Sequence, residues 1–313
     1  MKKIFVSGSL AFDRIMDFDG LFGDHILPNM THAINVSFMV PILTESYGGN
    51  AGNISYTLTL LGENATILGS AGNDFAPYEA WLAAHKIDTS LIQKDSTMRT
   101  AFATIMTDKN DNQITAFYPG AMQVPFQLDK VPFSDAAMVV VSPSNVETMR
   151  ALPEACRKNS IPFVFDPGQQ IPALSGDDLK NGIEGAKALI LNDYELQLVM
   201  QKTLWSEEEI LAHCEILVVT FGEKGSRIRR KADNVAILAA KPKAIVDPTG
   251  AGDAYRAGFV VGLIKGWDLD KCAKLGSVVA CYTVETEGTQ KYEFTKEAVA
   301  ARYKENYQED ISL

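Results

Sequence analysis

Residues 247–259 read DPTGAGDAYRAGF, a polar, glycine-rich run that leads into a helix-compatible segment. Glycines at 250 and 252 let the backbone approach a ligand closely, with consecutive N–H groups facing outward. Because these groups stand where a helix begins, their exposed donors and the helix dipole favour a bound anion. Asp253 lies in the first turn of that helix. A carboxylate beside an anion site is expected where it accepts a proton from an attacking hydroxyl.

An isolated Gly-x-Gly-Asp is weak evidence, because a tight turn whose Asp complements the helix dipole has the same form. The longer string, D-x-T-G-A-G-D-x-[FY]-x-A-G-F, resembles the C-terminal signature of the ribokinase (PfkB) family of carbohydrate and nucleoside kinases. The resemblance implies an ATP-dependent phosphotransferase with Asp253 as its catalytic base. It also implies that the backbone N–H groups of Gly250, Ala251 and Gly252 stabilise the charge that develops on the transferred group.

A second motif lies near the other end of the chain. Residues 47–53 read YGGNAGN and resemble the family's N-terminal signature, G-G-x-x-x-N. Gly48 and Gly49 permit a tight backbone approach, and Asn53 can donate to and accept from sugar hydroxyls. Asp13 fits the family's acidic residue that receives two vicinal sugar hydroxyls. A lone Asp after a strand is more often a turn or cap residue, but its position relative to both signatures favours substrate binding.

A third motif, NDYE, follows the predicted strand at 188–191. Asn192 and Glu195 match the family's N-x-x-E motif, which is associated with the magnesium–water network near the triphosphate. Oxygen ligands suit Mg²⁺, which keeps much of its hydration when bound. The alternative for the whole group is helix capping, with Asp193 as the N-cap.

The segment TFGEKG, at the next predicted strand, resembles the nucleotide-phosphate loop of the family. Thr220, Gly222 and Gly225 are the residues that this resemblance assigns to ATP. The family also commonly holds a monovalent cation, and here K⁺ would lie beside Asp247 and Thr249.

Within the family, the chain resembles bacterial adenosine kinases of the mycobacterial type over nearly its whole length. This resemblance implies transfer of the ATP γ-phosphoryl group to the 5′-hydroxyl of adenosine. Phe38 and Phe117 would contact the adenine ring from a lid, since flat aromatic faces suit a purine; lid packing is the alternative for each. Gln169 and Gln170 would face the nucleoside, and Ser9 would help to fix it. The resemblance is carried by NVSFMV (35–40), FYPGAM (117–122), DPGQQ (166–170) and ETEGTQ (285–290).

One departure from this subfamily concerns the stretch AFATIMT, where the expected aromatic is shifted by one position. Successive residues of a strand face opposite sides, so Phe102 is predicted to point away from the ligand and Ala103 toward it. This departure leaves open the alternative of a sugar kinase that acts on ribose or another carbohydrate.

The fold class follows from short apolar runs that alternate with amphipathic helical stretches. Continuous apolar strands between helices indicate a mainly parallel sheet covered on both faces, and the uneven spacing favours a doubly wound α/β fold over a barrel. The predicted strands are 3–6, 138–141, 162–165, 188–191 and 216–220, and the predicted helices include 145–158, 194–201 and 207–213.

Two further regions, 14–44 and 101–118, are predicted to be extended, and they do not fit the alternation of strands and helices in the main domain. We interpret them as a small β-sheet lid on one kinase domain that spans residues 1–313. Because an exposed lid edge is a liability unless it is paired, we predict a homodimer formed through the lid.

Composition narrows the possible partners. The 313 residues carry a formal net charge of -10, which repels the negatively charged backbone of a nucleic acid. A single nucleotide can still bind if a divalent cation and local backbone N–H groups offset its charge. The 4 cysteines are widely spaced, which predicts reduced thiols rather than a disulfide or zinc scaffold. No membrane span or signal peptide is predicted, and we expect a cytoplasmic enzyme.

Other classes of protein are less consistent with the motifs. An NAD-dependent dehydrogenase needs G-x-G-x-x-G after its first strand, and GSLAFD does not supply it. A P-loop kinase needs G-x-x-x-x-G-K-[ST], which is also missing. A non-catalytic nucleoside-binding regulator stays an alternative, and the intact Asp253 argues against it.

Overall fold

The computed structural model describes residues 2–26, 35–110, 112–231 and 233–313. Its main element is an 8-stranded sheet in the order β14-β13-β12-β11-β10-β9-β1-β4. The pairs from β4 to β12 are parallel, whereas β13 and β14 are antiparallel additions at one edge. The strands are β1 (Lys3–Ser7), β4 (Ala65–Leu68), β9 (Ala136–Val141), β10 (Phe163–Phe165), β11 (Ala188–Asn192), β12 (Leu217–Thr220), β13 (Ser226–Arg229) and β14 (Asn234–Ile237).

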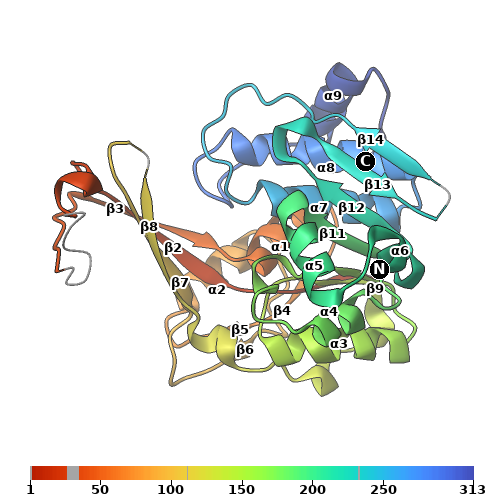
Figure 1. Ribbon diagram of the computed structural model, residues 1–313, viewed down its shortest axis with the longest axis horizontal. Helices are drawn as coiled ribbons and strands as arrows, with labels where there is room; N and C mark the ends of the chain where they lie inside the picture. Colours follow the sequence, from red (N-terminus) through yellow and green to blue (C-terminus); the bar gives the residue numbers. More distant parts are fainter. Residues whose placement is uncertain (1, 27–34, 111, 232) are drawn as a thin grey trace.

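Helices cover both faces of this sheet (Figure 1). Alternate residues of each buried strand enter opposite cores: Val6 and Val140 pack into one, whereas Phe5 belongs to the other. The first core is closed by α1 (Asn50–Leu60), α2 (Ala76–Ala84), α7 (Ala251–Ile264), α8 (Leu269–Val284) and α9 (Lys296–Tyr307). The second is closed by α3 (Val146–Lys158), α4 (Gly176–Ile183), α5 (Asp193–Thr203) and α6 (Glu207–His213). The predicted doubly wound α/β fold is confirmed.

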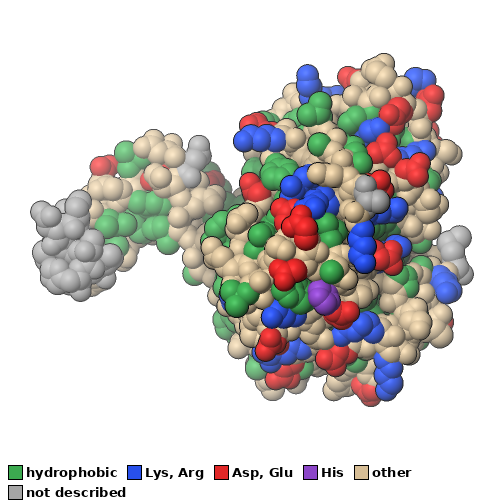
Figure 2. All heavy atoms as spheres, turned by 45° about the vertical axis from the view of Figure 1, so that its right-hand side comes forward, with side chains coloured by type: hydrophobic (Ala, Val, Ile, Leu, Met, Phe, Trp, Pro, Cys, Tyr) green, Lys and Arg blue, Asp and Glu red, His purple; other side chains and the backbone are tan. Residues whose placement is uncertain are grey.

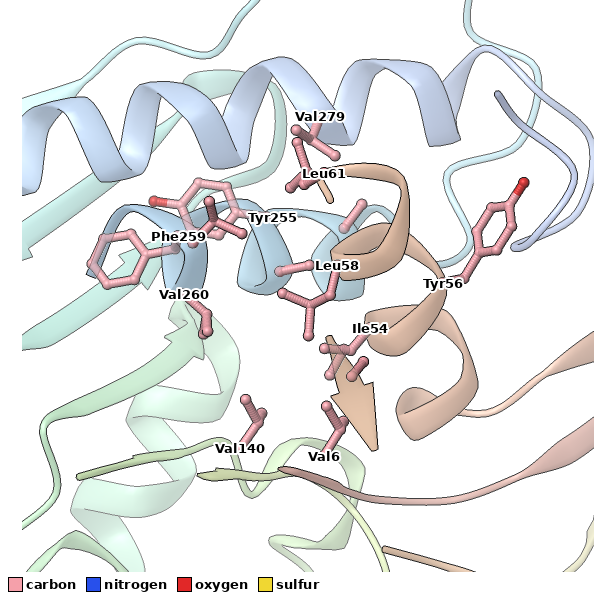
Figure 3. Packing of buried hydrophobic residues seen from close by; sticks show 14 of the residues in the cluster. Val6, Ile54, Tyr56, Leu58, Leu61, Val140, Tyr255, Phe259, Val260 and Val279 are labelled. Carbon is pink, nitrogen blue, oxygen red and sulfur yellow. The ribbon is translucent and has the colours of Figure 1, made fainter. Parts of the chain in front are cut away.

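The helices that carry the two signatures pack directly on each other. Figure 3 shows Leu58 of α1 beside α7, with Val260 of α7 facing the sheet residue Val140. Glycines also let α7 pack closely on α8: a Cβ at Gly258 would lie 2.7 Å from the Cα of Gly276 in α8. The starts of α1 and α7 are therefore held in a fixed relationship by the core.

A separate 4-stranded sheet, in the order β3-β2-β7-β8, forms the predicted lid. It projects from the main body, and its apolar side chains are partly open to solvent (Figures 1 and 2). The lid is longer than the predicted range 14–44, because β2 begins at Ala11 and β3 ends at Gly48. The lid sheet therefore reaches the motif YGGNAGN. Residues 27–34 and 111 of the predicted lid lie outside the described residues. The strands are β2 (Ala11–Asp17), β3 (Ile42–Gly48), β7 (Ala101–Thr107) and β8 (Gln113–Tyr118).

Candidate active site

The glycine-rich signature forms the turn into α7. Gly250 is the N-cap residue, with φ +79°, a left-handed conformation that glycine adopts without strain. The N–H of Ala251 donates to the oxygen of Pro248 at 3.2 Å, so this group is already used in the turn. Within the described residues, the N–H groups of Gly250 and Gly252 have no backbone acceptor. Of the three predicted donors, these two are the ones available to a ligand.

Asp253 is 5% exposed, and two asparagines of α1 hold its carboxylate. Asn50 Nδ2 donates to Oδ1 and Asn53 Nδ2 donates to Oδ2, each at 2.9 Å. Asn50 and Asn53 lie three residues apart, and this spacing puts both on one face of a helix. The carboxylate is thus fixed in place but keeps lone pairs for a further proton.

A buried amide supports this arrangement from behind. Gln290 Nε2 donates to Asn53 Oδ1 at 2.8 Å and to the hydroxyl of Tyr78 at 2.6 Å. The Tyr78 hydroxyl in turn donates to the oxygen of Gly48. The chain of contacts from Gln290 to Asp253 fixes the orientation of the Asn53 amide and links the ETEGTQ segment to the C-terminal signature.

A cavity of about 420 Å³ opens beside Asp253. We call it the acceptor cavity. It brings together polar groups at the Asp253 end and apolar groups from the lid and from the loop after β9. Predicted site residues in its lining are Ser9, Asp13, Gly49, Asn53, Phe117, Gln169, Gln170, Gly250 and Asp253, and further lining residues include Asn50, Ala103, Met122, Pro143 and Thr289.

Asp13 is the most unusual group in this cavity. Burial raises its pKa to about 6, and the nearby carboxylates of Asp247 and Asp253 add to the effect. None of the described residues donates a hydrogen bond to the Asp13 carboxylate. Gly48 makes room for it, since a Cβ there would lie 2.3 Å from Asp13 Oδ2. A partly buried carboxylate that accepts no hydrogen bond from a described residue is suited to accept them from a ligand.

Ser9, Gln169 and Gln170 also make contacts within the protein. Ser9 Oγ accepts from Asn50 N at 3.1 Å, which holds the start of α1. Gln169 Nε2 donates to Asn50 Oδ1, and Gln170 Nε2 donates to Ser144 O, each at 2.8 Å. These three residues line the acceptor cavity, and their contacts within the protein shape its wall.

The lid contributes one aromatic to the cavity. Ala103 and Phe117 are paired across β7 and β8, and both line it. Phe102 points to the other face, where Arg14 lies 4.5 Å from its ring centroid, as the strand alternation predicted. Phe38 is not among the lining residues. It packs in an aromatic cluster near the lid tip, 4.8 Å from Phe18 between ring centroids, because its segment follows β2 away from the body.

A second cavity, of about 300 Å³, lies on the other side of the α7 N-terminus. We call it the nucleotide cavity. The predicted residues Thr220, Gly222 and Gly225 line one wall. Gly225, with φ +96°, lies so close to the strand opposite that a Cβ would stand 2.0 Å from Ile237 O. Its remaining lining is mostly apolar, as suits a flat heterocycle, and includes Ala239, Ala240, Pro242, Ile245, Pro248, Ala280 and Val284.

A third cavity, of about 230 Å³, shares residues with both of the others. Asn192, Glu195 and Arg256 line it, together with Gly252 and Asp253. It lies where a phosphate chain would run from the nucleotide to the acceptor, so we call it the transfer cavity.

Asn192 and Glu195 form a capping box at the start of α5. Asn192 Oδ1 accepts from Glu195 N at 2.7 Å, and Glu195 Oε2 accepts from Asn192 N at 2.8 Å. The N-cap is therefore Asn192 and not Asp193, which corrects that alternative. In the described part of the chain, no cluster of three or more His, Cys, Asp or Glu could hold a metal directly.

Sequence reasoning overlooked three residues of this site. Asn50 stands inside YGGNAGN, and its spacing from Asn53 signals a shared helix face. Arg256 stands at a variable position of the C-terminal signature, which carries no signal of its own. Gln290 ends ETEGTQ, and only the fold brings it to Asn53, 237 residues away.

Two cavities that meet at a helix N-terminus and a fixed carboxylate define a phosphotransferase site of the small-molecule kinase class. The sequence pattern of the pfkB family of carbohydrate kinases matches residues 1–295, and the chain belongs to that family. It is an ATP-dependent kinase of nucleosides or sugars.

Relatives of known structure share the whole architecture. The Burkholderia thailandensis nucleoside kinase in complex with inosine superposes with a TM-score of 0.88 at 34% identity, over 98% of this chain and 100% of that chain. The Methanocaldococcus jannaschii nucleoside kinase superposes with a TM-score of 0.86 at 31% identity, over 97% and 99% of the two chains. In sequence, a nucleoside kinase of that organism is 32% identical over 93% of each chain.

These relatives are described as nucleoside kinases in general and not as adenosine kinases. Among the described residues, none of the helices has the length and hydrophobicity that crossing a bilayer requires.

Proposed function

We propose that this enzyme phosphorylates the 5′-hydroxyl of a purine nucleoside, with adenosine as a substrate and ATP as the donor. One observation carries the proposal: Asp13, whose carboxylate accepts no hydrogen bond from a described residue, and Asp253, whose carboxylate is anchored, line the same cavity. Asp13 would accept both hydroxyls of a ribose diol, and Asp253 would accept the proton of the reacting hydroxyl.

The apolar part of the acceptor cavity supports a nucleoside over a bare sugar. Phe117, Met122 and Pro143 line it together with the two carboxylates. A free pentose offers hydroxyls on all sides and would leave these groups without a partner, whereas a purine gives a flat apolar surface for them. The inosine complex of the Burkholderia thailandensis relative is consistent with a purine acceptor in this family branch.

The proposed transfer is direct and in line. The acceptor oxygen forms a bond to the γ-phosphorus while the bond to the β–γ bridging oxygen breaks, and ADP leaves with that electron pair. The hydroxyl proton passes to Asp253. The free N–H groups of Gly250 and Gly252 stabilise charge on the moving group at the start of α7.

Mg²⁺ would be held chiefly by the nucleotide phosphates and reached through water by Asn192 and Glu195. Their capping box uses the single side-chain oxygen of Asn192 and one oxygen of Glu195, and it leaves Glu195 Oε1 and the Asn192 amide N–H groups for such a contact. When bound, the ion neutralises phosphate charge. A K⁺ site beside Asp247 and Thr249 stays a prediction. Both carboxylate oxygens of Asp247 already accept a hydrogen bond from a backbone N–H group, one from Thr249 and one from Gly288.

The experiment is a screen of ADP release with adenosine, inosine, guanosine, cytidine, ribose and fructose at matched concentrations. The proposal expects the highest kcat/KM with a purine nucleoside. Faster turnover of ribose or fructose would replace it with the sugar-kinase alternative, and no ADP release with any acceptor would favour a binding protein.

We also propose a homodimer formed through the lid. The lid sheet has two edge strands, β3 and β8, and exposed apolar side chains on both, including Ile42, Leu43 and Ile114. Pairing with a second copy would cover these groups. Sedimentation at micromolar concentration tests this, and a monomer there contradicts it.

A further inference from the structure

The transfer cavity is negatively charged apart from one side chain. Glu195 and Asp253 line it, the buried Asp166 lies next to its arginine, and a triphosphate adds more negative charge. Among the described residues that line the acceptor, transfer and nucleotide cavities, Arg256 alone has a cationic side chain.

Arg256 is held in a fixed place. Its Nε lies 2.6 Å from Asp166 Oδ2, and its side chain is 12% exposed. Asp166 is fully buried. Among the described residues, its carboxylate makes this ion pair with Arg256, and neither of its oxygens accepts a hydrogen bond of ordinary geometry. An arginine anchored through Nε keeps its terminal Nη groups as a planar fork, a geometry that matches phosphate oxygens.

The terminal nitrogens face the reacting groups. Nη1 lies 3.6 Å from Asp253 Oδ1, and no described residue accepts a hydrogen bond from either Nη atom. Gly252 leaves room for this position, because a Cβ there would lie 2.6 Å from Nη1. The guanidinium therefore lies against the N-terminal turn of α7, beside the N–H groups that favour an anion.

The Arg256 guanidinium stays positively charged in this buried position. Burial lowers the pKa of Arg256, but the carboxylates of Asp166 and Asp253 outweigh this and raise it above the ordinary value. Burial raises the pKa of Asp166 to about 7 despite the arginine beside it. The guanidinium therefore keeps its charge at neutral pH.

We propose that Arg256 binds the γ-phosphoryl group of the nucleotide and stabilises it during transfer, with Asp166 as the residue that positions the guanidinium. This proposal rests on the kinase activity and not on which acceptor is used. As the bond to the leaving ADP oxygen breaks and the bond to the acceptor oxygen forms, the Nη groups donate to oxygens of the transferred group. The hydroxyl proton still passes to Asp253.

A merely structural role is the competing explanation, because loss of Arg256 leaves a buried unpaired carboxylate at Asp166. Three variants separate the two. Arg256→Met removes the donor, Arg256→Lys keeps a point charge, and the double variant Arg256→Met with Asp166→Asn removes the stranded charge as well. Arg302→Met is the matched control: it also removes a buried arginine, paired with Glu285 at 3.0 Å but outside the three cavities.

The test measures Kd by calorimetry for ADP and for the non-hydrolysable ATP analogue AMP-PNP, with Mg²⁺ present. No acceptor is needed, so the result stands even if the nucleoside proposal fails. Arg256→Met should leave the Kd of ADP within about threefold and weaken AMP-PNP about tenfold, because the lost contacts are to the third phosphate. Its kcat should fall roughly 10²–10³-fold, as for loss of a transition-state donor.

Arg256→Lys should fall between the wild type and Arg256→Met in kcat. The double variant should regain thermal stability without regaining AMP-PNP affinity. Equal weakening of ADP and AMP-PNP, or recovery of kcat in the double variant, would overturn the proposal in favour of a structural ion pair.

Discussion

Asn53 Nδ2 donates to Asp253 Oδ2 at 2.9 Å, and this bond joins the two signature helices across 200 residues of chain. The same asparagine accepts from Gln290 through Oδ1, so its amide cannot turn without breaking a second contact. The position of Asp253, the proposed base, therefore depends on a buried chain of side chains as well as on the turn that carries it.

Substitution of Asn53 by alanine should lower kcat about 10- to 100-fold, since a hydrogen bond to a charged group is worth roughly 1.5–3 kcal/mol. The measurement is steady-state kinetics with adenosine and ATP. Asn159→Ala is the control, because that amide donates to Ala155 O at the exposed end of α3. A wild-type kcat for Asn53→Ala would mean that Asp253 needs no positioning from α1.

Much of this arrangement could be predicted from sequence because its determinants are local. Each predicted strand of the main sheet overlaps an observed one, since burial on both faces requires the continuous apolar runs that the sequence displays. Glycine positions such as Gly49 and Gly250 were also informative, because their positive φ values restrict the choice of residue.

The features of the site that could not be predicted from the sequence depend on contacts between residues far apart in the chain. Arg256 faces the transfer cavity because Asp166, which follows β10, anchors it there. Phe38 resembles a base-contacting residue by motif, yet its ring belongs to a cluster with Phe18, Phe22 and His25. Strand alternation decides the side on which Phe102 lies, and the distant packing of the lid tip decides the place of Phe38.

Asp13 should make stability depend on pH. Its pKa is about 6 in the folded protein against an ordinary 3.8, so the folded state binds this proton more tightly than the unfolded chain does. The free energy of unfolding should therefore fall as pH rises from about 4 to about 6, by about 3 kcal/mol in total, and stay lower above that range.

Asp13→Asn isolates this effect. Without ligand, the variant should be more stable than the wild type above pH 6, and the difference should vanish near pH 4. Denaturant unfolding at pH 4.5, 6 and 7.5 measures it. A constant difference across that range would show that Asp13 is not the titrating group.

Substrate recognition should show the opposite pH dependence. A protonated Asp13 cannot accept both hydroxyls of a diol, so kcat/KM for adenosine should rise with pH and level off above about 6. In Asp13→Asn, kcat/KM should be at least about 100-fold lower, mostly through KM, because two hydroxyls lose a charged acceptor. A variant with normal KM would exclude the diol contact.

Substitutions of the two lid aromatics, Phe117 and Phe102, should have different effects: one on the affinity for adenosine and the other on the stability of the fold. Phe117 is 50% exposed and lines the acceptor cavity, so Phe117→Ala should raise KM for adenosine about tenfold with little change in unfolding. Phe102 packs against the core and beneath Arg14, so Phe102→Ala should reduce stability by about 1–3 kcal/mol. Nucleoside titrations and thermal unfolding of both variants test this, and the reverse pattern would mean that β7 presents its other face to the substrate.

Asp253→Asn is the most direct test of the central claim, that Asp253 is the base of a nucleoside kinase. Asparagine keeps the size of the side chain but cannot take a proton from the 5′-hydroxyl. We expect kcat with adenosine to fall roughly 10²–10⁴-fold, while the Kd of adenosine measured by calorimetry stays within about threefold. An Asn variant with nearly wild-type kcat would contradict the assignment of Asp253 as the base.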